Sequence, residues 1–253
     1  MTEWLRLDKY LADMGLGTRS EIRERIRKGR VRINQEVCKR PETKVLIGRD
    51  EVYMEDARVE YRKFFYLMLH KPAGVVSATT DLVNRTVLDL IKEKQGKELF
   101  PVGRLDKDTE GLLLLTNDGD LAHRLLSPRK HVDKVYYARV AGKVTEEDKE
   151  AFLQGVLIEE DYTTLPARLN ILRSGEVSEI ELTITEGKFH QVKRMFEAVG
   201  KEVIYLKRLS MGGLILDTEL APGDYRELTD GELKYLNSLR GELQGNTDYD
   251  EEG

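Results

Sequence analysis

Apolar and charged residues over positions 1–54 follow the spacing of two short helices and several short strands. Leu7 and Leu11 recur on one helical face within 5–14. Thr18, with Glu21 three residues later, predicts the N-terminal capping box of a second helix. Apolar stretches predict the strands that follow, at 31–33, 45–47 and 51–54. We expect residues 1–54 to form a small domain of two helices and a compact β-structure.

A polar stretch, 55–63, is expected to be a linker to a longer domain, 64–240, in which strand patterns dominate. The strands expected there lie at 65–69, 100–105, 112–115, 132–140, 165–172, 177–185, 202–208 and 213–217. The helices expected there lie at 86–92, 120–126, 145–155, 189–199 and 228–239. Because strands outnumber helices and do not alternate with them strictly, the predicted fold class is α+β, with a mostly antiparallel mixed sheet flanked by helices.

The composition is that of a soluble, ordered protein: of 253 residues, 40% are hydrophobic and 34% are charged. No apolar run approaches the roughly 18 residues of a membrane span, and the charged N-terminus lacks the apolar core of a signal peptide. The single cysteine, Cys38, excludes an internal disulfide, and the four histidines lack the i, i+4 spacing of metal ligands. We therefore expect a cytoplasmic monomer with no metal, no cofactor and no membrane attachment.

The net charge of −5 is distributed unevenly along the chain. Five of the 46 acids lie in residues 241–253, a tail that we expect to be disordered, so the rest of the chain holds 41 acids and 41 bases. Seven bases and two acids fall within 19–32. A basic helix is usually a solvated surface, but this density favours binding to the phosphates of a nucleic acid. The predicted RNA contacts in this helix are Arg19, Arg23, Arg27, Lys28 and Arg30.

Residues 103–119, GRLDKDTEGLLLLTNDG, combine the pattern of a buried strand with several acids. Leu112–Leu115 is bounded by Gly111 and by Asn117–Gly119, which predicts a buried strand that leaves a turn. A carboxylate held where such a strand meets a loop, as Asp106 would be, is well placed for catalysis. A hairpin with solvated acids is the alternative, and this stretch alone leaves it open.

Three further segments carry a resemblance to a known family: KPAGVVSAT at 71–79, DKVYY at 133–137 and EGKFHQVKRMFEAVG at 186–200. Together with 103–119 they resemble the pseudouridine synthases that modify ribosomal RNA, in the RsuA/RluB/RluE/RluF branch. Residues 4–50 resemble the alpha-L RNA-binding domain first known from a small-subunit ribosomal protein, which implies binding to structured RNA.

The resemblance implies roles for individual residues. The nucleophilic aspartate of the family falls on Asp106 and its active-site tyrosine falls on Tyr136. The basic residue that pairs with the aspartate falls on Lys193, with Arg194 as the second candidate. Some branches carry arginine at this position, and a lysine lacks the bidentate geometry of a guanidinium. Further RNA contacts are expected from Arg104, His190, Gln191 and Arg194.

The chemistry that the resemblance implies is consistent with these residue types. Isomerising uridine to pseudouridine breaks the N-glycosidic bond, turns the base and rejoins it through a ring carbon. A carboxylate can attack the anomeric carbon or take a ribose proton, and both routes remain open for Asp106. Lys193 would keep Asp106 ionised as the site closes. Tyr136 would stack on the extruded uracil.

Several of these residues also have purely structural interpretations. Asp108 and Glu110 are expected to be loop or capping acids. Tyr136 and Tyr137 alternate along one strand, so one of the two must face the core. Arg104 is as suited to supporting the Asp106 loop as to contacting a phosphate.

Separate enzymes of this family modify small-subunit and large-subunit ribosomal RNA. Three runs look closer to the small-subunit type: LLSPRKHVDKVYY at 125–137, TEEDKEAFLQGVLIEEDYTTLPARL at 145–169 and APGDYRELTDGEL at 221–233. The expected substrate is one uridine of 16S rRNA in a small-subunit assembly intermediate, and 23S rRNA is the alternative. Two other classes remain, a non-catalytic ribosome assembly factor and a glycoside hydrolase. The hydrolase would use Asp106 with Glu110, carboxyls that would have to lie roughly 5–10 Å apart.

Overall fold

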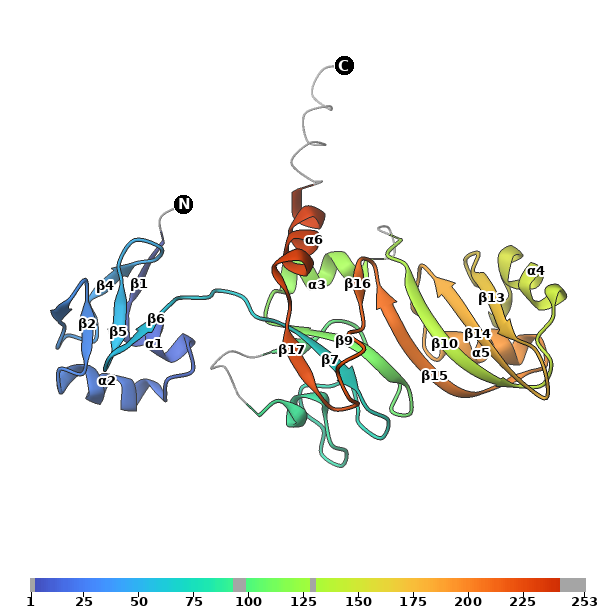
Figure 1. Ribbon diagram of the computed structural model, residues 1–253, viewed down its shortest axis with the longest axis horizontal. Helices are drawn as coiled ribbons and strands as arrows, with labels where there is room; N and C mark the ends of the chain where they lie inside the picture. The colour runs from blue at the N-terminus through green and yellow to red at the C-terminus, as the bar shows by residue number, and fades with distance from the viewer. Residues whose placement is uncertain (1–2, 93–98, 128–130, 242–253) are drawn as a thin grey trace, which may run out of the picture. The chain divides into compact units, whose positions relative to one another are not determined.

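The computed structural model describes residues 3–92, 99–127 and 131–241, in two compact units (Figure 1). The first unit comprises residues 1–65 with 91–99, and the second comprises residues 66–90 with 100–253. The tail expected to be disordered lies, except for its first residue, outside the described residues. Within the described ranges, no helix is both long and apolar enough to cross a membrane.

The first unit combines two helices with two small antiparallel sheets. Its elements are β1 (Trp4–Arg6), α1 (Leu7–Asp13), α2 (Arg19–Arg27), β2 (Val31–Ile33), β3 (Glu36–Val37), β4 (Lys44–Leu46), β5 (Val52–Met54) and β6 (Ala57–Val59). One sheet pairs β1 with β4, and the other has the order β3–β2–β5–β6. The predicted capping box of α2 is confirmed, because Thr18 and Glu21 each accept a hydrogen bond from the other's backbone N–H.

The core of the first unit lies between the two helices and the strands. Leu7, Leu11, Ile22 and Ile26 are completely buried there. Burial of a side chain of this kind contributes about 1.5–3 kcal/mol each. The helical spacing of apolar residues therefore identified the face of each helix that packs inward.

The structure differs from two expectations in this unit. Residues 55–63, expected to be a linker, contain β6, which pairs with β5 and extends the sheet beyond residue 54. Because β6 is an edge strand whose side chains are largely exposed, no apolar alternation marks it. The first helix begins at Leu7 rather than at residue 5, because Trp4–Arg6 pairs with Lys44–Leu46.

The second unit is built around a nine-stranded sheet of order β13–β14–β10–β15–β9–β7–β17, with β16 beside β15 and β8 beside β9. Its strands are β7 (Tyr66–Lys71), β8 (Phe100–Pro101), β9 (Glu110–Thr116), β10 (Lys134–Ala141), β13 (Arg168–Arg173), β14 (Val177–Ile184), β15 (Glu202–Met211), β16 (Leu214–Ile215) and β17 (Tyr225–Glu227). All neighbours are antiparallel except β9 and β15. The predicted α+β class and mostly antiparallel sheet are confirmed.

Helices cover both halves of this sheet. They are η1 (Val87–Leu90, a 3-10 turn), α3 (Gly119–Leu126), α4 (Glu146–Gln154), α5 (Gln191–Ala198) and α6 (Asp230–Gly241). Figure 1 shows α3 and α6 beside β7, β9 and β17, and α4 and α5 beside β10, β13, β14 and β15. Phe152 of α4 and Phe196 of α5 meet edge to face, with ring centroids 5.0 Å apart. The side chain of Asp118 caps α3 by accepting from the Leu121 N–H at 3.2 Å.

The parallel contact between β9 and β15 depends on Gly111. A Cβ at this position would lie 2.2 Å from the carbonyl oxygen of Arg208, and the φ of Gly111 is +107°. Only glycine therefore allows the two backbones to approach this closely. The junction brings the loop that precedes β9, which carries Asp106, to the side of β15.

Several elements of the second unit were not predicted. The hairpin β11 (Leu157–Glu159) with β12 (Tyr162–Thr163) and the edge strand β17 are short and lie in polar surroundings. The expected helix at 86–92 is only the 3-10 turn η1. Beside η1, Val76 and Thr86 form a single isolated bridge.

Candidate active site

Asp106 lies in the loop between β8 and β9, and this loop is held from both sides. The Leu105 N–H donates to the Ser77 hydroxyl at 3.0 Å, and that hydroxyl donates to the Leu105 carbonyl at 2.8 Å. On the other side, the Gly74 N–H donates to the carbonyl of Lys107 at 2.7 Å. Segment 71–79 therefore fixes the backbone before and after Asp106.

Lys71, at the end of β7, also holds this loop. It is fully buried, and its Nζ donates to the carbonyls of Pro72, Lys107 and Thr109 at 3.0, 3.3 and 2.8 Å. Burial lowers the pKa of Lys71 to about 8, although nearby carboxylates, first that of Asp108, oppose the shift. Lys71 thus acts on Asp106 through the backbone. The sequence analysis included Lys71 in the segment 71–79 but gave it no role of its own, although a lysine that ends an apolar strand was the available signal.

Two side chains of the segment 190–193 approach the Asp106 carboxylate. Lys193 Nζ lies 3.4 Å from Asp106 Oδ2, and His190 Nε2 lies 3.6 Å from Asp106 Oδ1. The Asp106 side chain is 23% exposed, so it remains accessible from the cleft. Predicted residues from two separate segments, 103–119 and 186–200, are therefore brought together at the Asp106 carboxylate.

Lys193 is shared between two carboxylates. Its Nζ donates to Asp108 Oδ1 and Oδ2 at 2.7 and 2.8 Å, which is closer than its contact with Asp106. Partial burial opposes ionisation of Asp108, but the hydrogen bond and charge of Lys193 keep the pKa of Asp108 below its ordinary value. Asp108, expected to be only a loop acid, therefore orients Lys193 beside Asp106.

Arg194, the second candidate for the cation at Asp106, is directed elsewhere. It forms an ion pair with Glu159, and its guanidinium lies 5.4 Å from the centroid of the Phe189 ring. His190, in the left-handed conformation with φ of +53°, stacks on Phe189 with ring centroids 3.7 Å apart. The turn at His190 thus separates the side chains that face Asp106 from the Arg194 ion pair.

Gln191, a predicted RNA contact, is buried and closes the turn before α5. Its amide donates to Glu186 at 2.8 Å and accepts from the Lys188 N–H at 2.8 Å. Glu186 also accepts from the Tyr162 hydroxyl. Gln191 therefore has an intramolecular role whether or not it contacts RNA.

A cleft of about 950 Å³ opens over Asp106 and adjoins a smaller recess of about 110 Å³. Asp106, Arg104 and His190 line both spaces. Arg104 is exposed and makes no hydrogen bond or ion pair within the described part of the chain. Glu110 lines neither space and accepts instead from the Tyr205 hydroxyl at 2.7 Å. The pair of carboxyls that a glycoside hydrolase would need does not face this cleft.

The inward face of β10 and β15 lines the recess on one side, and residues of the Asp106 loop and of segment 184–192 complete it. Tyr136 lines it and is 8% exposed, whereas Tyr137 lies on the opposite face, where its ring contacts Tyr205. Of the two adjacent tyrosines, the predicted Tyr136 is therefore the one that faces the site. Lys134 and Arg208 also line the recess, and neither was predicted.

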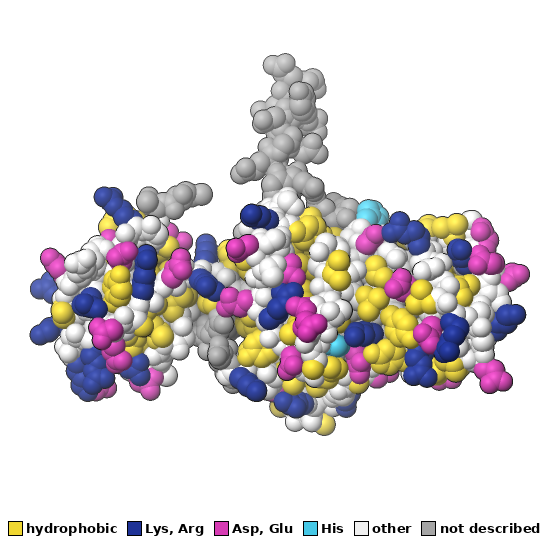
Figure 2. Space-filling model, in the orientation of Figure 1, with side chains coloured by type: hydrophobic (Ala, Val, Ile, Leu, Met, Phe, Trp, Pro, Cys, Tyr) yellow, Lys and Arg dark blue, Asp and Glu magenta, His cyan; other side chains and the backbone are white. Residues whose placement is uncertain are grey.

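The basic helix of the first unit carries mostly paired charges, and Figure 2 shows Lys and Arg interspersed with Asp and Glu over this unit. Three of the five predicted contacts are paired with acids: Arg23 with Asp8, Lys28 with Glu24, and Arg30 with Glu55. Arg19 and Arg27 make no hydrogen bond or ion pair within the residues that the structure describes. These two are therefore the most available to a phosphate.

Comparison with known proteins identifies relatives over most of the chain. The family described as RNA pseudouridylate synthase matches residues 65–198, and the S4 domain matches residues 5–52. The Bacillus subtilis protein YtzG, named as an RNA pseudouridine synthase, is 51% identical over 92% of this chain and 98% of its own.

Two further relatives differ in the RNA that their names specify. Ribosomal small subunit pseudouridine synthase A of Escherichia coli is 40% identical, over 90% of this chain and 98% of its own. Ribosomal large subunit pseudouridine synthase B of Bacillus subtilis is also 40% identical, over 92% of this chain and 96% of its own. Among solved structures, a pseudouridylate synthase with 39% identity has a TM-score of 0.65 and covers 92% of this chain and 99% of its own.

Proposed function

The chain belongs to the RNA pseudouridylate synthases of the RsuA type, with an N-terminal S4 domain, and we propose that it isomerises one uridine of 16S ribosomal RNA. The substrate in this proposal is a small-subunit assembly intermediate, bound by a cytoplasmic monomer. Asp106 is the catalytic nucleophile, Tyr136 stacks on the extruded base, and Lys193 is the cation of the site.

The observation that carries the proposal is the setting of the Asp106 carboxylate. It lies in a loop held by Ser77 and Lys71, beside Lys193 at 3.4 Å, and it lines both the cleft and the recess that contains Tyr136. A carboxylate held by its backbone beside a cation can attack a sugar carbon without reorganisation. Abstraction of a ribose proton by Asp106 is the alternative step.

The S4 domain and the cleft would bind the RNA together. Arg19 and Arg27 of the basic helix, and Arg104 at the cleft, carry guanidinium groups without intramolecular partners among the described residues. Such groups suit the phosphates of RNA. Extrusion of the target uridine costs a few kcal/mol, which stacking on Tyr136 and these contacts would offset.

Large-subunit RNA is the second candidate substrate. The small-subunit enzyme of Escherichia coli and the large-subunit enzyme of Bacillus subtilis have the same 40% identity to this chain. The sequence segments at 125–137, 145–169 and 221–233 favour the small-subunit RNA.

Pseudouridine mapping by carbodiimide and primer extension tests this proposal in cells with and without the protein. We expect one uridine of 16S rRNA to lose its signal in the deletion and to regain it with the wild type but not with Asp106→Asn. Loss of a site in 23S rRNA would support the proposed reaction and show that the substrate is large-subunit RNA. If no site were lost in either RNA, the proposal would fail in favour of a non-catalytic assembly factor.

A further inference from the structure

Arg208 is a buried guanidinium with an unused donor. It is 3% exposed, and its Nε donates to the Leu112 carbonyl at 2.8 Å. Its Nη2 is buried without any hydrogen-bond partner. A buried donor without a partner loses its hydration and gains nothing in return, so such atoms are rare unless an ordered water or a ligand completes them.

Lys134 lies in the same recess. It is 7% exposed, and its Nζ donates to the Val132 carbonyl at 2.9 Å, although an ammonium group has three donors. Burial, and then the charge of Arg208, lowers the pKa of Lys134, while Asp133 and Glu186 oppose the shift. Neither Lys134 nor Arg208 forms an ion pair within the described part of the chain.

Two like charges buried together without a paired carboxylate are unfavourable in the free protein. Desolvating one ion costs several kcal/mol, and a neighbouring like charge adds to that cost. A negatively charged or strongly polar ligand would offset both. The recess is therefore incomplete without an oxygen-bearing ligand.

A third side chain in the recess also has a buried polar atom without a hydrogen-bond partner. Thr109 is 1% exposed, lines the recess, and its Oγ1 has no hydrogen-bond partner. Of the three buried, unpartnered side-chain atoms in the described residues, two thus belong to the recess, and the third is His70 Nε2. A hydroxyl can donate or accept, as a pyrimidine edge with both carbonyls and an N–H requires.

We propose that Arg208, assisted by Lys134, binds a carbonyl oxygen of the extruded uracil and stabilises the negative charge that the ring gains when its N-glycosidic bond breaks. This assignment rests on the proposed function and adds a residue to it. Arg208 is the register partner of Tyr136 on the adjacent strand, so a base stacked on Tyr136 would lie beside the guanidinium.

The position in the recess favours the base over a phosphate as the ligand. An RNA strand enters and leaves the site, so its phosphates follow the open cleft, where Arg104 and Lys188, which line both spaces, can reach them. An extruded base has a free end and can enter a recess. The apolar side chains of Ile184 and Leu206, which also line the recess, suit a ring and not a phosphate.

The charge balance requires no proton from Arg208. When the C1′–N1 bond breaks, its electron pair leaves with the uracil ring and is delocalised over N1, O2 and O4. On the first route, C1′ becomes bonded to the Asp106 carboxylate, which leaves again when C5 attacks. On the alternative route, the carboxylate takes the proton of C2′, a double bond forms between C1′ and C2′, and the proton returns to C2′ when C5 bonds to C1′. When C5 bonds to C1′, the ring returns its electron pair, the C5 proton is lost to a base and N1 is reprotonated. Arg208 remains a cation throughout.

A leaving-group test distinguishes this role from a structural one. A ribosomal RNA fragment that contains the uridine identified by pseudouridine mapping is prepared with either uridine or 5-fluorouridine at that position. Loss of this nucleoside is then followed in a single turnover. Fluorine withdraws electrons and stabilises the ring anion, so it reduces the need for Arg208. We expect Arg208→Gln to slow the uridine substrate about 100-fold and the 5-fluorouridine substrate about 10-fold. Lys134→Gln should also slow the uridine substrate more than the 5-fluorouridine substrate, but the difference between the two rate losses should be smaller.

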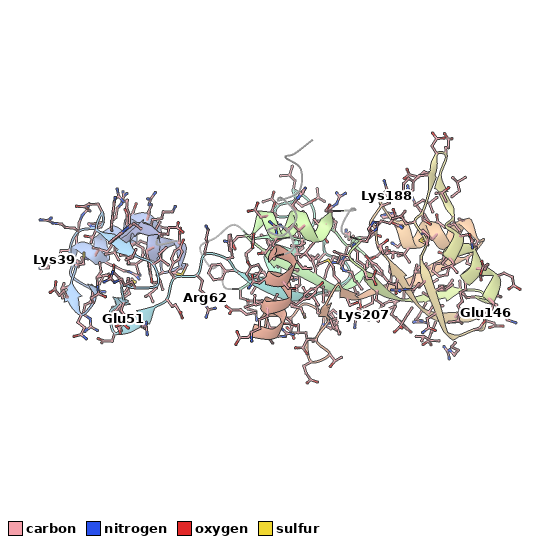
Figure 3. All side chains as sticks on the ribbon, turned by 90° about the horizontal axis from the view of Figure 1, so that it is seen from above. Lys39, Glu51, Arg62, Glu146, Lys188 and Lys207 are labelled. Carbon is pink, nitrogen blue, oxygen red and sulfur yellow. The ribbon has the colours of Figure 1, made fainter. Side chains whose placement is uncertain are left out.

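The matched control is Lys207→Gln, next to Arg208 on β15. Lys207 faces away from the recess, and Figure 3 shows it on the opposite side of the sheet from Lys188, which lines the cleft. This variant should react like the wild type with both RNAs. An equal loss on both RNAs for Arg208→Gln and for Lys134→Gln would overturn the proposal in favour of a structural role.

A second experiment distinguishes whether Arg208 contacts the base or a phosphate of the RNA. Methylphosphonate at the target nucleotide removes the phosphate charge, and we expect it to weaken binding equally in the wild type and in Arg208→Gln. A loss confined to the wild type would assign Arg208 to a phosphate and overturn the proposal. If the wild type reacted with neither RNA, the proposed function itself would fail, a result that is distinct from any change between variants.

Discussion

The basic helix of the first unit and the recess of the second unit use cations in opposite ways. At the end of this helix and just beyond it, Lys28 and Arg30 are more than half exposed and face Glu24 and Glu55. In the recess, Lys134 and Arg208 are buried without a carboxylate partner in the described chain. Exposed ion pairs contribute about 0–1 kcal/mol and exchange readily for RNA phosphates. Buried, unpaired cations are kept at a cost in stability and indicate a ligand.

The active site contains a third arrangement, a cation shared between two carboxylates. We expect Lys193→Met to lower kcat by about 100- to 1,000-fold, because it removes the charge beside Asp106. Asp108→Asn, which only loosens Lys193, should have a smaller effect. Single-turnover kinetics on the mapped RNA measures both, and an unaffected Lys193→Met would show that this cation is not part of the catalysis.

Lys71 is a buried cation whose donors are satisfied by carbonyls, so its effect should appear in stability rather than in ligand binding. Its pKa is lowered from 10.5 to about 8 in the folded state. Between these values the unfolded chain holds a proton that the folded chain lacks, so stability rises with pH, by up to about 1.4 kcal/mol per pH unit. Urea unfolding from pH 7 to 10.5 should show this rise in the wild type and in Lys207→Met. The same slope in Lys71→Met would contradict the assignment.

Within the basic helix, Arg23 differs from Arg27 because it is paired with a buried carboxylate. It donates at 2.9 Å to Asp8, whose side chain is fully buried and also accepts from Arg6. Burial opposes ionisation of Asp8, but the two guanidinium groups hold the pKa of Asp8 below its ordinary value. We expect Arg23→Met to destabilise the protein by about 1–2 kcal/mol, because it removes one partner of a buried carboxylate. Thermal unfolding measures this loss of stability. The control, Arg27→Met, should leave the stability of the protein unchanged.

Arg27 should show the smallest effect, confined to RNA binding. Arg27→Met removes an unpaired surface charge, so the salt dependence of log affinity should become shallower by about one unit. Filter binding at several salt concentrations measures the slope. A larger change in slope for Lys28→Met than for Arg27→Met would reverse the distinction between paired and unpaired bases.

Local signals in the sequence were enough to predict some features. The capping box at Thr18 and Glu21 and the apolar run Leu112–Leu115 depend only on residues a few positions apart, and both are present. The approach of Lys193 to Asp106 followed from family resemblance, not from spacing. The predictions that RNA binds at Arg104, His190, Gln191 and Arg194 stay predictions, although Gln191 and Arg194 have internal partners.

Other features depend on which strands pair, and local patterns could not predict them. β6 lies at a sheet edge, where polar residues are tolerated on both faces. Lys134 and Arg208 occupy inward positions of β10 and β15, but a charged residue on a strand looks like a surface position until the partner strands and covering helices are known. Their burial was therefore visible only in the folded chain.

Release of tritium from ribosomal RNA that carries [5-³H]uridine tests the central claim most directly, because pseudouridine formation removes the C5 proton. We predict release by the wild type and by Asp108→Asn, and none by Asp106→Asn at equal RNA affinity. Release by Asp106→Asn at the wild-type rate would contradict the account, because it would remove the Asp106 carboxylate from the chemistry.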